Sequence, residues 1–195
     1  MELYPSENDF LAVQTAMSRL GLNIEKPYII VHPTSRWLWK CWEDERFANL
    51  IDWLQKHHQI SVIVTCSPDK RELERARAIL SSCSTPPRAL LGELELTHWA
   101  ALVQKARLFV GVDSAPMHIA ASQNVPTVAL FGPTGFQNWR PWDVRHTVLA
   151  HDCPCAHDRQ PHCDWSRTRA CMSLITFEEV QTAVDNLLQH STISH

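Results

Sequence analysis

Polar residues at the end of one apolar run have the types and spacing that suit diphosphate binding. Asp113, Ser114 and His118 follow a run that ends at Val112, and Pro116 suits a first helical turn. The unpaired amides of such a turn attract phosphate, and the Ser114 hydroxyl would add a donor. Asp113 would repel phosphate, so we expect it to contact sugar hydroxyls or the amides of its own turn. An ordinary capped helix with a hydrogen-bonded histidine explains the same residues.

A second loop combines hydroxyls with cations. Thr34, Ser35, Arg36 and Lys40 follow another apolar run and are interleaved with tryptophans, a set suited to phosphate oxygens. A third loop, residues 131–135, has glycines that allow close backbone approach to a ligand. A solvated turn or an interface edge explains the second loop as well, and turn formation explains the third.

Cysteines and histidines gather between residues 151 and 171. Cys153, Cys155, Cys163 and Cys171 would supply enough ligands for a structural zinc ion. Their spacing is C-x-C with scattered partners, whereas structural zinc sites usually show paired C-x2-C motifs. We favour reduced thiols that pack an irregular loop and keep zinc as the alternative.

The elements that must position these loops alternate along the chain. Expected strands are residues 28–31, 60–66, 89–91, 108–112, 127–131 and 146–150. Expected helices are residues 7–20, 43–57, 97–106, 114–123, one that Ser67 caps and that runs to Ser81, and one that begins at a Thr176 capping box. This alternation predicts an α/β fold, a Rossmann-like parallel sheet with helices on both faces. Ligands bind such sheets beyond the carboxyl ends of the strands, where all three loops lie.

Composition excludes several classes of protein. The 195 residues are 45% hydrophobic and 20% charged, which predicts one soluble globular domain. The net charge of -3 gives no overall attraction to nucleic acid or anionic lipid. No apolar run reaches the roughly 20 residues of a membrane span, and the first residues show no leader, so we expect a cytoplasmic chain. No G-x-G-x-x-G follows an expected strand, which disfavours a NAD enzyme.

Two stretches together resemble a known family. Residues 111–118 (GVDSAPMH), followed by residues 126–134 (PTVALFGPT), resemble the carboxyl-terminal donor domain of the lipopolysaccharide heptosyltransferases, the ADP-heptose enzymes of glycosyltransferase family 9. Residues 32–35 with 40–42 are similar to the first donor loop of that family, and Cys171-Met172 is similar to its usual ending. The cysteine-rich and tryptophan-rich loops are most similar to the enzymes that add a branch heptose to the inner core.

The resemblance implies the carboxyl-terminal half of a GT-B fold that binds ADP-heptose and needs no cofactor. The implied donor-binding residues are Thr34, Ser35, Lys40, Glu72, Asp113, Ser114, Ala115 and His118. Glu72 would hold the ribose, and Ala115 stands where many relatives have glycine. The lipopolysaccharide core would be the acceptor, and the enzyme would work in the cytoplasm or peripherally at the cytoplasmic face of the inner membrane.

In this family the amino-terminal half binds the acceptor and carries the proposed catalytic carboxylate. Nothing before Tyr28 is long enough for that half, so we expect residues 1–195 to be a single donor-binding domain with no catalytic base and little transfer alone. Residues 1–26 would be a lead-in helix and linker, and residues 151–171 the cysteine-rich loop. The alternatives are another GT-B sugar-nucleotide enzyme, such as an epimerase, and a nucleotide-binding module without chemistry.

Overall fold

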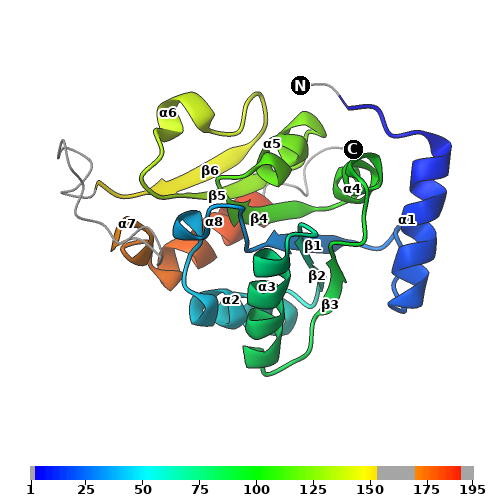
Figure 1. Cartoon of the computed structure of the whole chain (residues 1–195), viewed down its shortest axis with the longest axis horizontal. Helices are drawn as coiled ribbons and strands as arrows, with labels where there is room; N and C mark the ends of the chain where they lie inside the picture. Colours follow the sequence, from blue (N-terminus) through cyan, green and yellow to red (C-terminus); the bar gives the residue numbers. More distant parts are fainter. Residues whose placement is uncertain (1–2, 153–169, 190–195) are drawn as a thin grey trace.

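A computed structural model describes residues 3–152 and 170–189. In this part the chain forms a six-stranded sheet with all neighbouring pairs parallel, in the order β3-β2-β1-β4-β5-β6 (Figure 1). The strands are β1 (Tyr28–His32), β2 (Ser61–Cys66), β3 (Arg88–Leu91), β4 (Leu108–Val112), β5 (Thr127–Phe131) and β6 (His146–Ala150). The predicted parallel sheet is therefore confirmed, with each strand within one residue of its expected bounds.

Helices cover both faces of the sheet (Figure 1). One face packs against α2 (Asp44–His57), α3 (Lys70–Ser82) and α8 (Phe177–Gln189), and the other against α1 (Glu7–Arg19), α4 (Leu96–Gln104) and α5 (Ala115–Ser122). Three short elements complete the described chain: a 3-10 turn η1 (Leu38–Lys40), α6 (Phe136–Trp139) and α7 (Ala170–Ser173).

The unbroken apolar runs are explained by this double cover. In β1, Ile29 and Val31 belong to the core under α2 and α8, whereas Tyr28 and Ile30 belong to the core under α1 and α4. All these side chains are fully or almost fully buried. Because successive strand residues point to opposite faces, a strand covered on both sides must be apolar at every position.

Helix ends follow the sequence signals in part. Ser6 and Asp9 form the capping box of α1, and Gly21 after this helix has a φ of +71°, a left-handed conformation that suits glycine. The predicted cap of α3 is wrong. Asp69, not Ser67, caps it by accepting from the Arg71 amide at 2.9 Å. The Ser67 hydroxyl is occupied elsewhere, since it donates to the buried Glu72 carboxylate at 2.6 Å.

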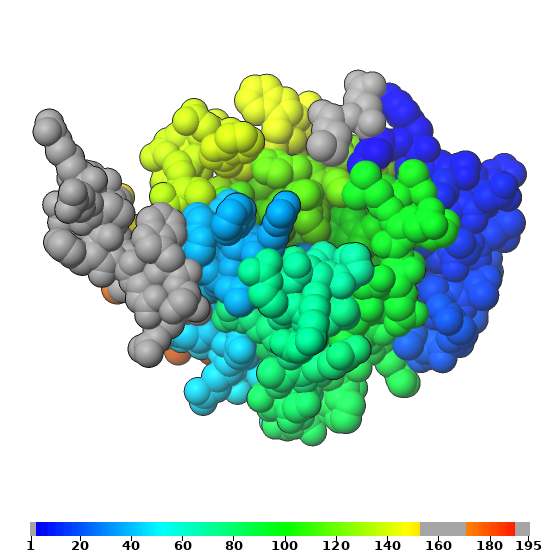
Figure 2. All heavy atoms as spheres, in the orientation of Figure 1, coloured from blue at the N-terminus to red at the C-terminus, as the bar shows by residue number. Residues whose placement is uncertain are grey.

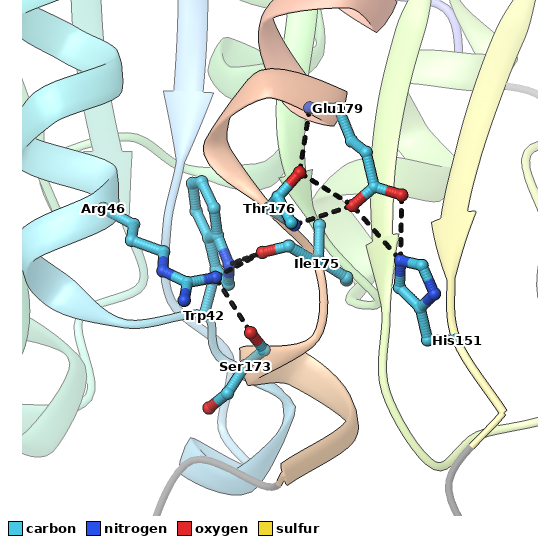
Figure 3. Close-up of polar contacts among 7 residues, drawn as sticks. All are labelled: Trp42, Arg46, His151, Ser173, Ile175, Thr176 and Glu179. Carbon is cyan, nitrogen blue, oxygen red and sulfur yellow. Dashed lines mark hydrogen bonds and ion pairs between the residues drawn. The ribbon is translucent and has the colours of Figure 1, made fainter.

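The predicted Thr176 capping box is present at the start of α8 (Figure 3). Thr176 and Glu179 exchange hydrogen bonds of 2.7 and 3.2 Å between backbone and side chain, and His151 Nε2 lies 3.0 Å from the same Glu179 carboxylate. The Trp42 indole donates to the Ile175 carbonyl at 2.9 Å just before the helix. These contacts tie α8 to the end of β6 and to the segment that leads into α2.

The order of the strands decides where a ligand can bind. From β1 the chain moves outward through β2 to β3, and it then returns to β4 beside β1 and moves outward in the other direction. The loops that leave β1 and β4 therefore diverge, and they open a crevice at the carboxyl ends of these central strands.

Candidate functional site

A cavity of about 630 Å³ lies in this crevice. Its walls come from the loops after β1, β2, β4 and β5, and the lining includes every residue that the family resemblance assigned to the donor: Thr34, Ser35, Lys40, Glu72, Asp113, Ser114, Ala115 and His118. In Figure 2 the light-blue loop after β1 and the yellow-green segment around α6 lie next to each other on this face of the molecule. The fold thus brings together side chains that are far apart in sequence.

Close packing of β4 against β1 shapes the floor of the cavity. A Cβ atom at Gly111 would lie 2.9 Å from the His32 carbonyl oxygen and 2.7 Å from the Phe109 ring, so only glycine fits at this position. His32 itself lines the cavity, and its Nδ1 lies 2.9 Å from the Thr65 hydroxyl. Burial lowers the pKa of His32 to about 3, so the imidazole is neutral at pH 7. The sequence analysis did not assign this residue to the site.

The loop after β1 presents hydroxyls to the cavity. Thr34 and Ser35 are buried, and Thr34 Oγ1 has no hydrogen-bond partner in the structure. A buried polar atom without a partner costs about 1–3 kcal/mol. The Thr34 hydroxyl is therefore a costly buried group in a residue that lines the cavity.

Asp113 lies at the centre of a polar cluster. Lys40 Nζ is 2.6 Å from Asp113 Oδ2, and the Thr134 hydroxyl donates to the same oxygen at 2.6 Å. The side chains of Lys40 and Asp113 are 16% and 7% exposed, so solvent screens this pair little. The expected partners of Asp113 within its own turn are thus wrong. The carboxylate is instead held across three loops, after β1, β4 and β5.

Thr134 was missed by the sequence analysis, which considered only the glycines of its loop. The loop supplies Thr134 to the cavity lining and neither of its glycines. A Cβ atom at Gly132 would lie 2.9 Å from Met172 Sδ, so this glycine allows packing against α7, not the approach of a ligand. The only sign of Thr134 in the sequence is a hydroxyl residue between the two glycines. No local pattern shows that this hydroxyl faces Asp113.

The amino terminus of α5 lacks a side-chain cap. Ser114 occupies the cap position, but its hydroxyl donates to the Val112 carbonyl at 3.1 Å, so the predicted capping hydroxyl is wrong. Pro116 has no N–H, and the Met117 amide donates to the Ser114 carbonyl at 3.1 Å. The amide of Ala115, which lines the cavity, therefore remains at the positive end of the helix for an anion.

His118 lies one turn along α5 and also lines the cavity. Burial lowers its pKa, the negative charge of Asp113 partly opposes this shift, and Lys40 adds to it. The ring is therefore neutral at pH 7 and packs edge-on against Trp139, with 6.3 Å between ring centroids. A neutral imidazole offers one donor and one acceptor, which suits sugar hydroxyls.

Contacts from α3 hold the loop that carries Lys40. Arg75 forms an ion pair of 2.6 Å with Asp44 and donates to the carbonyls of Leu38 and Trp42, at 3.2 and 2.9 Å. These carbonyls lie on either side of Lys40. Arg75, which is outside the cavity lining, thus holds the backbone on both sides of Lys40.

The described residues include only some of the tryptophans and cysteines near the carboxyl-terminal end of the sheet. Trp139 and Trp142 are 58% and 80% exposed, so neither belongs to the core. Cys171 is buried, whereas the segment with Cys153, Cys155 and Cys163 lies outside the described residues, as does Trp165. Within residues 3–152 and 170–189 no group of metal-binding side chains is present. For residues 151–171 we keep the expectation of reduced thiols, with zinc as the alternative.

Comparison with known proteins decides the family. Residues 4–168 match the family described as glycosyltransferase family 9 (heptosyltransferase). This chain belongs to glycosyltransferase family 9. It is 37% identical over 166 residues to lipopolysaccharide heptosyltransferase 3 of Escherichia coli, an alignment that covers 85% of this chain and 48% of that protein. The family 9 chain thus spans about half the length of the curated relatives it matches.

Solved structures agree with this assignment. The family 9 glycosyltransferase of Veillonella parvula superposes with a TM-score of 0.84 at 26% identity, over 97% of this chain and 54% of that one. The ADP-heptose heptosyltransferase II of Escherichia coli superposes with a TM-score of 0.80 at 23% identity, over 98% and 54%. The predicted Rossmann-like α/β fold of a GT-B glycosyltransferase is confirmed. No helix in the described ranges is long and apolar enough to cross a bilayer.

Proposed function

We propose that this chain forms the donor site of a heptosyltransferase, which holds ADP-heptose for transfer to the inner core of lipopolysaccharide. The observation that carries the proposal is the convergence of Thr34, Lys40, Asp113 and the start of α5 on one cavity in a member of family 9. The relatives named lipopolysaccharide heptosyltransferase support the donor and acceptor classes, with a branch heptose as the expected product.

The donor lies with its diphosphate at the amino terminus of α5. The Ala115 amide and the hydroxyls of Thr34 and Ser35 donate to phosphate oxygens, and Lys40 keeps N–H groups for them beyond the one directed at Asp113. Donors placed in this way stabilise the negative charge that the departing ADP acquires. Glu72, held by the Ser67 hydroxyl, accepts from the ribose, and Asp113 accepts from the sugar.

Transfer also needs a carboxylate within reach of the acceptor hydroxyl. The carboxylates that line the cavity have other partners: Asp113 pairs with Lys40, Glu72 accepts from Ser67, and Asp69 caps α3. We therefore propose that the base is none of these three. A donor site without a base gives little transfer, so residues 1–195 alone should bind the donor and turn it over slowly or not at all.

Thermal unfolding of the purified chain with and without ADP-heptose tests the proposed donor. A ligand at 100 times its Kd adds about 2.7 kcal/mol to the folded state, which raises the Tm of a chain of this size by about 5–10 °C. Asp113→Ala should abolish most of this rise. Thr97→Ala is the matched control, because Thr97 donates to Asp9 at 2.7 Å far from the cavity and its loss should leave the rise unchanged.

Two results would contradict the proposal. A Tm rise with UDP-sugars equal to that with ADP-heptose would indicate another sugar-nucleotide enzyme. Binding of ADP with no glycosylated acceptor, even after an acceptor-binding half of the family is supplied, would indicate a nucleotide-binding module without chemistry.

We also propose that the enzyme works at the cytoplasmic face of the inner membrane, because the proposed acceptor is lipid-linked. Co-sedimentation with inner-membrane vesicles tests this location.

A further inference from the structure

One oxygen of Asp113 is occupied twice. Lys40 Nζ and the Thr134 hydroxyl both contact Oδ2 at 2.6 Å, and among the described residues no hydrogen bond reaches Oδ1. Asp113 lines the cavity and is almost completely buried, yet Oδ1 is not among the buried atoms that lack a partner. The remaining exposure of the carboxylate therefore lies at Oδ1, an acceptor that faces the cavity.

The cavity has no excess of positive charge. Its lining contains the cations Arg36 and Lys40 and the carboxylates Asp69, Glu72 and Asp113. Lys40 is already paired with Asp113, which directly precedes the cap residue of α5. His118 adds no charge at pH 7, because burial lowers its pKa. An anion at this end of the cavity therefore meets a fixed carboxylate as well as the donors of α5.

Nucleotide sugars and free nucleotides differ in charge at this end. In ADP-heptose the terminal phosphate is esterified by the sugar, so each phosphate carries one negative charge. In ADP the terminal phosphate carries no ester group and has a second pKa near 6, as a phosphate monoester has, so it carries almost one further charge at pH 7.5. This further charge sits where the sugar was attached, beside Asp113 in the proposed pose. Like charges a few Å apart in a partly buried site repel strongly.

We propose that Thr134 is a positioning residue that, together with Lys40, fixes Asp113 so that this carboxylate selects sugar-bearing donors against free nucleoside diphosphate. The inference rests on the proposed donor site and deepens it. Asp113 Oδ1 accepts from a hydroxyl of the transferred sugar, and the same charge repels the doubly charged terminal phosphate of ADP. Because Thr134 and Lys40 both contact Oδ2, the carboxylate is fixed with Oδ1 left for the sugar hydroxyl.

The fixed Asp113 carboxylate also assists release of the ADP product. During transfer the bond between the anomeric carbon and the β-phosphate oxygen breaks, and its electron pair stays on that oxygen. The acceptor oxygen forms the new bond to carbon and loses its proton to a base. The leaving nucleotide thereby gains a free terminal phosphate, whose further charge Asp113 repels, and the sugar that Asp113 held passes to the acceptor. Substrate and product are therefore distinguished by one fixed carboxylate.

Isothermal titration with three probes separates charge from sugar contacts. The probes are ADP, the β-methyl ester of ADP and ADP-heptose, measured at pH 7.5. The methyl ester has the charge of the donor but no sugar hydroxyls. For the unmodified chain we expect the methyl ester to bind about tenfold more tightly than ADP, and ADP-heptose to bind more tightly again.

Substitutions then assign the two effects to residues. Asp113→Asn should remove the difference between ADP and its methyl ester. Thr134→Val should weaken ADP-heptose about tenfold and ADP less than about threefold, because the lost hydrogen bond orients a charged acceptor of the sugar. Thr134→Ser keeps the hydroxyl and should restore binding. Thr97→Val removes a similar hydrogen bond to Asp9 and should leave all three affinities unchanged.

Different results overturn different claims. If the unmodified chain binds ADP as tightly as the methyl ester, the inference is wrong whatever the variants do, so it does not depend on their folding. If Thr134→Val weakens all three probes equally, or Thr134→Ser fails to restore ADP-heptose binding, Thr134 is not a positioning residue. If none of the probes binds the unmodified chain, the proposed function itself is wrong. Binding of the probes without discrimination rejects only the inference.

Discussion

Replacing Thr34 by valine should stabilise the protein and weaken its ligand binding. Thr34 is fully buried, and Oγ1 has no hydrogen-bond partner. Valine has nearly the same shape, so the substitution removes an unsatisfied polar atom without opening a cavity. The relief should be about 1–3 kcal/mol, which raises the Tm by about 2–12 °C for a chain of this size. Function and stability oppose each other at this residue, as expected where a site is prepared for a ligand.

The opposite effect is expected on binding. A hydroxyl that donates to a charged phosphate oxygen contributes about 1.5–3 kcal/mol, so Thr34→Val should raise the Kd for ADP-heptose about 10- to 100-fold. Differential scanning calorimetry without ligand and isothermal titration with ADP-heptose measure the two effects on the same preparation.

A second buried threonine provides the matched control. Thr127 is also fully buried, but its hydroxyl donates to the Val125 carbonyl at 2.9 Å, and it lies outside the cavity lining. Thr127→Val should therefore lower the free energy of unfolding by about 1 kcal/mol and leave binding unchanged. If Thr34→Val destabilises the ligand-free protein as much as Thr127→Val does, the argument that Thr34 awaits a ligand is refuted.

Three further predictions follow from the site. Arg75→Met should release the backbone on both sides of Lys40 and raise the Kd for ADP-heptose about three- to tenfold in a titration. Lys70→Met, on the exposed side of the same helix, is the control and should leave this Kd unchanged. The folded-state pKa of His32 is lowered to about 3, so below pH 6.5 the unfolded chain binds more protons than the folded chain does. The free energy of unfolding therefore falls as the pH is lowered from 6.5 toward 3. Urea unfolding at several pH values between 6 and 4 gives the free energy of unfolding as a function of pH. Its slope against pH should be steeper by about 1 kcal/mol per pH unit in the unmodified chain than in His32→Asn, and equal slopes would contradict the assigned burial. Metal analysis of protein purified without added zinc or chelator should find less than about 0.1 zinc per chain, and stoichiometric zinc would favour the alternative for residues 151–171.

Local patterns predicted the elements of the fold because their causes are local. An unbroken β-branched run such as residues 28–31 is stable only when both faces are covered, so it indicates a central parallel strand. A capping box such as Ser6 with Asp9 satisfies amides within one turn and needs no tertiary partner. The same patterns failed at Ser67 and Ser114, because neither hydroxyl accepts from an amide of the helix's first turn and each instead donates to a nearby acceptor, the carboxylate of Glu72 and the carbonyl of Val112.

The sequence also predicted which residues share a cavity, whereas their binding of the donor stays a prediction. The family motifs placed Thr34, Lys40, Asp113 and His118 in the site, and all of them line one cavity. Thr134 was missed because its role depends on Asp113, which is reached through a loop from a neighbouring strand. No regular spacing along the chain links two loops that meet only after the sheet has formed.

The amino-acid order by itself determined the alternation of strands and helices, the double cover of the sheet and the family to which the chain belongs. These depend on side-chain chemistry read along a few turns or strands. Only the tertiary structure decided which side chains share an oxygen of Asp113, that Thr34 lacks a partner and that Arg75 holds the loop of Lys40. Hydrogen bonds act over about 3 Å, and packing distant segments to that accuracy requires the whole sheet with its helices.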